Sequence, residues 1–310
     1  MKHNLKVTFF LIILFFTAQV IGLYLLNQSI ETVEITDTGI IVKYEEPITG
    51  RPELEGQESF TYILGMIFFG TLILFFLIKF KLFKVWKVWF FLAIWGALLI
   101  SFSVFLSEIF AVLLALILTI LKLYKPNVII HNITEVFMYS GIAILISPLF
   151  TVFWAIMLLI AISVYDMIAV WKMKHMITLA KAQADQKMFA GLFIPYSKSK
   201  IMVPHDKVVE KSEIKVKIPK GFKEKEIKSA ILGGGDIAFP LLFTGAIMTW
   251  LIQQGLSKEL SFFYSLIISL SSGMALFLLL IKSKKDKFYP AMPFISLGCF
   301  IGFAIIYLII

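Results

Sequence analysis

Two aspartates stand inside long apolar stretches of this sequence. Asp166 lies near the end of an apolar run at 149–171, and Asp236 lies near the start of another at 229–253. An ionisable side chain is costly in such surroundings and usually has a function there. Two carboxylates that share a site of low dielectric cannot easily both ionise, so one of them keeps its proton. Such a pair can take a proton from water and give another to a carbonyl oxygen.

Three consecutive glycines, Gly233, Gly234 and Gly235, come directly before Asp236. Glycine weakens a helix, so this run predicts a frayed helix start whose backbone groups are free to bind an extended peptide. Close packing of helices through small residues explains the same glycines, and this alternative stays open. A phosphate-binding loop is excluded, because no Gly-Lys-Ser/Thr sequence follows.

The residues just before the glycines, 229–232, include Ile231 and Leu232 and join a polar loop to the apolar run. We expect this stretch to be mobile in the free protein and to become a strand when an extended peptide adds to its backbone. A weaker candidate for the same role is the alternating apolar pattern of 214–218. The plain alternative is that a helix simply begins at residue 229.

A third segment, Pro290-Ala291-Met292, opens the last apolar run and follows a cluster of lysines. Proline is well tolerated in the first turn of a helix, which is the ordinary explanation. Two prolines three residues apart, Pro290 and Pro293, also predict non-helical backbone. Within a membrane such backbone is tolerated only where it is buried in protein or lines a cavity. The segment therefore joins the candidate site residues.

The composition predicts a multi-pass membrane protein. Of the 310 residues, 59% are hydrophobic and only 16% are charged, which is more apolar surface than one aqueous core can hide. The net charge of +9 does not indicate nucleic-acid binding, because fourteen lysines and only six acids fall within 171–229 and account for most of it. One cysteine and four scattered histidines show no metal-ligand spacing, so we expect neither a metal nor a cofactor.

The apolar runs predict an all-α integral membrane protein with nine transmembrane helices. Each even-numbered run ends in a lysine-rich segment, which places the N-terminus in the cytoplasm and the C-terminus outside. The chain then divides into a six-helix part at 1–171, a basic cytoplasmic loop at 172–228 and a three-helix part at 229–310. Asp166 and Asp236 fall at a similar depth near the cytoplasmic side. The predicted spans are 7–26, 60–78, 88–106, 109–124, 127–147, 149–171, 229–253, 260–281 and 290–310.

Taken together, these motifs resemble those of the presenilin and signal-peptide-peptidase family of intramembrane aspartyl proteases. The family has nine spans, Tyr-Asp in span six, Gly-x-Gly-Asp in span seven and Pro-Ala-Leu at the start of span nine. Tyr165-Asp166 and Gly233-Gly234-Gly235-Asp236 match in full, whereas Pro290-Ala291-Met292 has Met in place of Leu. The basic loop after span six is similar in orientation to the presenilin branch, and the compact length is similar to its prokaryotic, archaeal members.

The resemblance implies an aspartic endopeptidase of the GxGD type that hydrolyses peptide bonds in or near transmembrane helices of other proteins. Asp166 and Asp236 would be catalytic, and Tyr165 would orient or shield the site. The glycines, Ile231, Leu232 and the Pro290 segment would bind the substrate. The implied partners are transmembrane-helix substrates and the lipid bilayer of the cell membrane.

Three alternatives remain open at this point. The first is an ion channel or ion-coupled transporter that uses the paired aspartates. The others are a prepilin-peptidase-like enzyme, which also has a Gly-x-Gly-Asp motif, and an inactive chaperone or scaffold.

Overall fold

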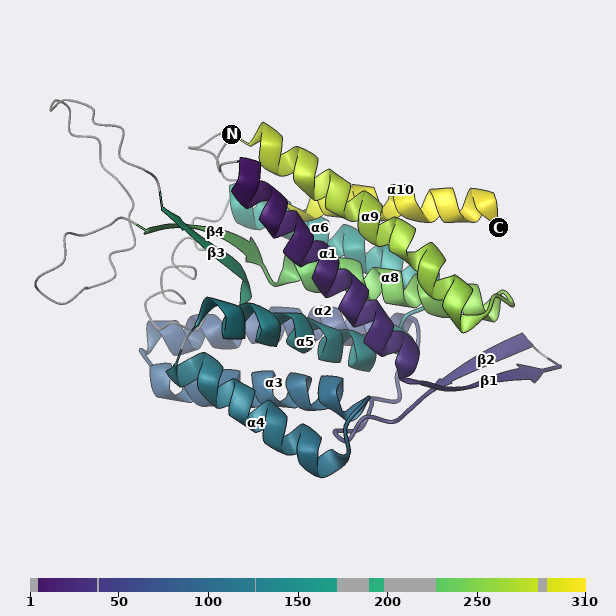
Figure 1. Cartoon of the computed structure of the whole chain (residues 1–310), viewed down its shortest axis with the longest axis horizontal. Helices are drawn as coiled ribbons and strands as arrows, with labels where there is room; N and C mark the ends of the chain where they lie inside the picture. The colour runs from purple at the N-terminus through teal and green to yellow at the C-terminus, as the bar shows by residue number, and fades with distance from the viewer. Residues whose placement is uncertain (1–4, 38, 126, 172–189, 198–226, 284–288) are drawn as a thin grey trace, which may run out of the picture.

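The computed structural model of the chain describes residues 5–37, 39–125, 127–171, 190–197, 227–283 and 289–310. The possible strand at 214–218 and most of the predicted loop at 172–228 lie outside the described residues. Within them, long helices gather into one bundle, with a β-hairpin at each end (Figure 1).

The helices of the described part match the predicted apolar runs in number and order. Eight of them are long and apolar enough to cross a membrane, and α4, with 17 residues, is slightly shorter than this group. A short 3-10 turn, η1 (Ser147–Leu149), follows α5. The long helices are α1 (Leu5–Gln28), α2 (Gln57–Lys79), α3 (Phe83–Ser103), α4 (Glu108–Tyr124), α5 (Val128–Ile146), α6 (Val152–Trp171), α8 (Gly235–Gln253), α9 (Lys258–Lys282) and α10 (Met292–Ile309).

Two hairpins accompany the helices. Near the N-terminal half, β1 (Ile30–Thr36) pairs with β2 (Gly39–Tyr44), and at the other end of the bundle β3 (Gly191–Ser197) pairs with β4 (Ile227–Gly233), both antiparallel. The sequence analysis predicted neither pairing. The bundle is helical, as expected, but the chain also contains two small antiparallel sheets, which the all-α prediction did not include.

The start of the seventh predicted span differs from the expectation. The helix α8 begins at Gly235 rather than at residue 229, because β4 occupies the residues before it. The stretch 229–232 was expected to be mobile until a peptide adds to it. It is already a strand in the free chain, since β3 provides the backbone partners that a lone strand lacks.

The helix that carries Asp236 is the centre of the bundle. Of the most apolar window of α8, 72% is buried inside the structure, compared with 6% for α2 at the periphery. The helices α1, α5, α6, α9 and α10 all pack against α8. A residue at the start of α8 is therefore held from several sides.

Small residues bring the helix backbones close together at two interfaces. A methyl group added to Gly141 of α5 would overlap the carbonyl oxygen of Ala97 in α3. Gly298 of α10 lies against the backbone of α9 in the same way. A Cβ added to Gly298 would be 2.7 Å from the Cα of Ser272. Such approaches are typical of membrane helices, where packing has to replace the hydrophobic effect between helices.

Candidate active site

The two aspartates lie at the same end of the bundle, on neighbouring helices. Asp166 is in the last turns of α6, and Asp236 is in the first turn of α8. The two helices pack together, and both aspartates are partly buried. The structure thus places two residues that are 70 positions apart in the chain at the same end of the bundle. The sequence analysis had predicted a similar depth for both.

The start of α10 reaches the Asp166 carboxylate. The backbone N–H of Met292, the first residue of the helix, donates a hydrogen bond of 3.1 Å to Oδ2 of Asp166. The first N–H groups of a helix have no partner within the helix, and the helix N-terminus attracts negative charge. Proline in the first turn leaves such a helix start intact. The structure therefore brings the end of the Pro290-Ala291-Met292 segment to Asp166 through the Met292 N–H.

The three glycines link β4 to α8. Gly233 ends the strand, Gly234 precedes the helix and Gly235 begins it. A Cβ added to Gly233 would lie 3.3 Å from Oδ2 of Asp236, so the carboxyl group folds back over this residue. A Cβ added to Gly234 would lie 2.5 Å from the hydroxyl oxygen of Tyr139. Close packing therefore explains the first two glycines, while Gly235 meets only ordinary contacts with Phe239.

Side chains of α5 cover one edge of the β3–β4 hairpin. Both backbone groups of Phe193 bond to the amide of Asn132, at 2.9 and 2.8 Å. The backbone N–H of Gly191 donates to Glu135 at 2.8 Å, and its carbonyl oxygen accepts from Nε2 of His131 at 2.8 Å. The next residue on this edge, Pro195, has no N–H to offer. The outer edge of β3 is therefore closed to a further strand.

Three functional candidates were missed by the sequence analysis. Tyr139, Glu135 and Lys122 are buried, and both Tyr139 and Lys122 donate hydrogen bonds to the Glu135 carboxylate. An acid within an apolar run, the signal that identified the two aspartates, was also present at Glu135. Tyr139 carried no comparable signal, because its contact with Gly234 joins distant parts of the chain.

The remaining predicted residues lie around the site in different ways. Leu232 is buried, whereas Ile231 is 45% exposed on the opposite face of β4. Tyr165 is 46% exposed, and among the described residues no hydrogen bond joins it to either aspartate. The described residues contain no group of three or more His, Cys, Asp or Glu side chains that could hold a metal ion.

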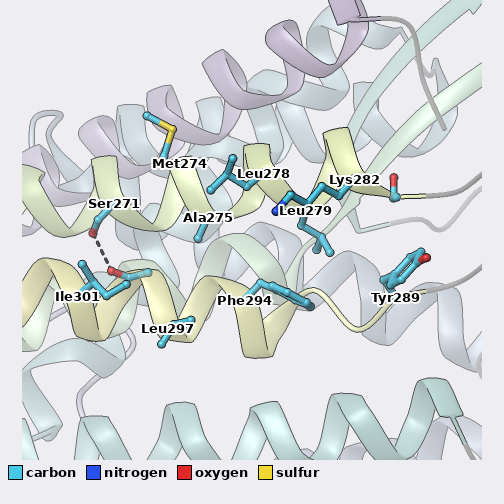
Figure 2. A pocket seen from close by; sticks show the side chains of 12 residues that line it. Ser271, Met274, Ala275, Leu278, Leu279, Lys282, Tyr289, Phe294, Leu297 and Ile301 are labelled. Atoms are coloured by element: carbon cyan, nitrogen blue, oxygen red, sulfur yellow. Dashed lines mark hydrogen bonds between the residues drawn. The ribbon is translucent and has the colours of Figure 1, made fainter. Parts of the chain in front are cut away.

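A groove of about 450 Å³ opens between α9 and α10, but it does not contain either aspartate (Figure 2). Its walls are mostly apolar, and Lys282 and Tyr289 lie at one end. The site around Asp166 and Asp236 is therefore defined by its side chains and backbone groups, and the groove is a separate feature.

A bundle of apolar helices with two aspartates on neighbouring helices at one end defines a multi-pass membrane protein with a candidate paired-acid site. A family model described as signal-peptide peptidase, presenilin aspartyl protease, matches residues 12–310. The chain belongs to this family of intramembrane aspartyl proteases. Family membership favours proteolysis over a channel or transporter.

Solved structures share the fold. The structure of a presenilin family intramembrane aspartate protease in space group C222 matches with a TM-score of 0.59 and 16% identity, over 95% of this chain and 94% of that one. Another structure of a presenilin family intramembrane aspartate protease, in space group P2, matches with a TM-score of 0.56 and 18% identity, over 97% of each chain. The search of curated proteins gave no match.

The contact between Gly234 and Tyr139 predicts a sensitive position. Gly234→Ala should lower the rate of cleavage of a membrane-spanning peptide roughly 10- to 100-fold, because a small displacement at the start of α8 moves Asp236. Removing the obstructing hydroxyl should relieve the effect, so adding Tyr139→Phe to Gly234→Ala should cost less than the two single changes combined. The matched control is Gly96→Ala, where nothing lies within 4 Å of the added methyl group. Equal activity of the Gly234 and Gly96 variants would contradict this account.

Proposed function

We propose that Asp166 and Asp236 are the catalytic pair of a GxGD-type protease that hydrolyses peptide bonds in or near transmembrane helices. The observation that carries this proposal is the convergence of three elements: α6 and α8 each supply a carboxyl group, and α10 donates a backbone hydrogen bond to one of them. The bond to Met292 fixes the orientation of the Asp166 carboxyl group. Pairing of this kind is the arrangement in which two acids divide the roles of base and acid.

The chemistry follows from a pair that carries one proton. The charged carboxylate takes a proton from water as the water oxygen attacks the carbonyl carbon, and the protonated partner gives its proton to the carbonyl oxygen. The tetrahedral intermediate then collapses, the C–N bond breaks and the leaving nitrogen receives a proton from the pair. Because one acid has to be charged and the other protonated, the two act as one unit.

This unit can be tested by single and double substitutions. Asp166→Ala and Asp236→Ala should each reduce cleavage of a membrane-spanning peptide by roughly 10³-fold or more. The double variant should be no worse than either single variant, since each change already removes the shared mechanism. The measurement is product formation by purified protein in proteoliposomes, at matched protein levels. Substantial activity in either single variant would contradict the shared mechanism.

The free edge of β4 is where we place the substrate backbone. In an antiparallel pair, residues alternate between positions that bond to each other and positions that bond outward. Gly191 and Phe193 bond outward to α5, so their partners in register, Gly233 and Ile231, also direct their backbone groups away from β3. Among the described residues, no hydrogen bond from outside the hairpin reaches the backbone of Ile231.

An unwound substrate segment requires such an edge. A transmembrane helix hides its carbonyl groups, so it has to unwind before cleavage, and unwound backbone in lipid needs hydrogen-bond partners. A substrate strand added to β4 gains these partners and is directed along the strand toward Asp236. Because the substrate would be bound mainly through its backbone, we expect little selectivity for the substrate's side chains. Tyr165, Gly235 and the Pro290 segment would line the rest of the path.

The strand proposal gives a sharp test at Ile231. Ile231→Pro removes an N–H that the hairpin itself does not use, so cleavage should fall roughly tenfold or more while thermal stability changes little. Ile231→Val is the matched control, because it keeps the backbone and the strand preference and should be nearly as active as the wild type. Both are measured on one substrate. Near-normal activity of the proline variant would show that this edge does not bind the substrate.

We further propose that all nine long helices of the described part cross the membrane, with the active site near the cytoplasm. The helix α4 rises about 25 Å, which approaches the thickness of the hydrocarbon core. Figure 1 shows the N-terminal end of α1 and the β3–β4 hairpin at one end of the bundle, and the β1–β2 hairpin and the C-terminus at the other. Lysines mark the first end, and acids mark the second, including Glu31, Glu34, Asp37, Glu45 and Glu46. The positive-inside rule places the lysine-rich end in the cytoplasm.

Single cysteines at exposed positions test this orientation. In intact cells, an impermeant thiol reagent should label Glu46→Cys directly, whereas Lys84→Cys should be labelled only after the membrane is opened. The natural Cys299 is buried and gives a low background. The reverse pattern would place the active site on the outer side and would change which substrates can enter.

A further inference from the structure

Glu135 connects three elements through one buried carboxylate. Its side chain is completely buried, and its two oxygens accept hydrogen bonds from Lys122 of α4, from Tyr139 of α5 and from the backbone N–H of Gly191 in β3. A buried charge is costly unless it is paired and hydrogen-bonded. The arrangement satisfies this requirement and at the same time ties the hairpin to the helices.

The same carboxylate reaches the Gly-Gly-Gly-Asp motif by two routes. Through Gly191, it holds β3, whose partner strand β4 runs directly into the motif, with Gly191 opposite Gly233. Through Tyr139, it holds the ring that lies against Gly234. A shift of Glu135 would therefore be transmitted to the strand and to the start of α8 together.

We propose that Glu135 is a positioning residue that fixes the place of the β3–β4 hairpin relative to Asp166 and Asp236 and so selects which peptide bond is cut. This inference rests on the proposed addition of a substrate strand to β4. If the substrate is held along β4, a displacement of this strand relative to the aspartates brings a different substrate bond next to them. The network then controls the position of cleavage, and its loss broadens the set of products.

A purely stabilising role for the ion pair makes a different prediction. Loss of a structural contact lowers the amount of folded protein and the total rate, but the bond that is cut stays the same. The identity of the products therefore separates the two roles, and the rate alone does not.

The experiment uses the full chain in proteoliposomes with one membrane-spanning peptide, and the products are identified by mass spectrometry. Glu135→Gln keeps the shape of the side chain and removes its charge. Asn132→Ala tests the same edge of β3 without removing a buried charge, so it also serves if Glu135→Gln fails to accumulate. The matched control is Gly302→Ala, which crowds the contact between α10 and Ile268 of α9 and leaves the hairpin contacts in place.

We expect a dominant cleavage position in the wild type. In Glu135→Gln and Asn132→Ala, products cut at neighbouring bonds should rise at least about twofold relative to the main product, and exchange of the Gly191 or Phe193 amide hydrogens with solvent should accelerate. In Gly302→Ala, the product pattern should match the wild type even where stability falls.

Two results would overturn the inference. Unchanged cleavage positions in both hairpin variants, with an active wild type, would reject the positioning role and leave the proposed protease intact. A wild type that cleaves no more than Asp236→Ala would reject the proposed function and this inference with it.

Discussion

Lipid provides no hydrogen bonds, so a carboxylate or a strand edge at membrane depth is stabilised by partners within the protein. The Asp166 carboxylate receives the first N–H of α10, and the Glu135 carboxylate receives three donors from separate elements. The hairpin that precedes Asp236 follows the same rule, since one edge of β3 pairs with β4 and the other bonds to α5. Within the β3–β4 pair, the outer edge of β4 at Ile231 receives no hydrogen bond from outside the pair among the described residues.

This constraint also explains why the site lies where it does. The helix α8 is the most buried long helix of the described bundle and begins within the Gly-Gly-Gly-Asp motif, so packing on several sides fixes the position of Asp236. Glycines allow the backbone to come close to Tyr139 and to the carboxyl group itself. The protein thus combines a well-packed helix start, which holds Asp236, with a strand that we propose as the binding edge for an unwound peptide.

Much of this could be predicted from the sequence, because the signals were local. Apolar runs of sufficient length located the helices, and acids within those runs located Asp166 and Asp236. The roles of these aspartates stay predictions, and so do those of Tyr165, the glycines and the Pro290 segment. The state of 229–232 was predicted wrongly, because a strand depends on its partner and β3 lies more than thirty residues earlier in the sequence. Tyr139 was missed for the same reason, since only the fold brings it to Gly234.

The central claim is that Asp166 and Asp236 act together on one carbonyl group. It is tested most directly by binding of a substrate-like peptide in which a hydroxyethylene group replaces the bond to be cut, since the hydroxyl mimics the tetrahedral intermediate. The wild type should bind this peptide roughly 100-fold or more tightly than the same peptide without the hydroxyl, and Asp166→Ala and Asp236→Ala should each lose that preference. A preference that survives in either variant would contradict the account.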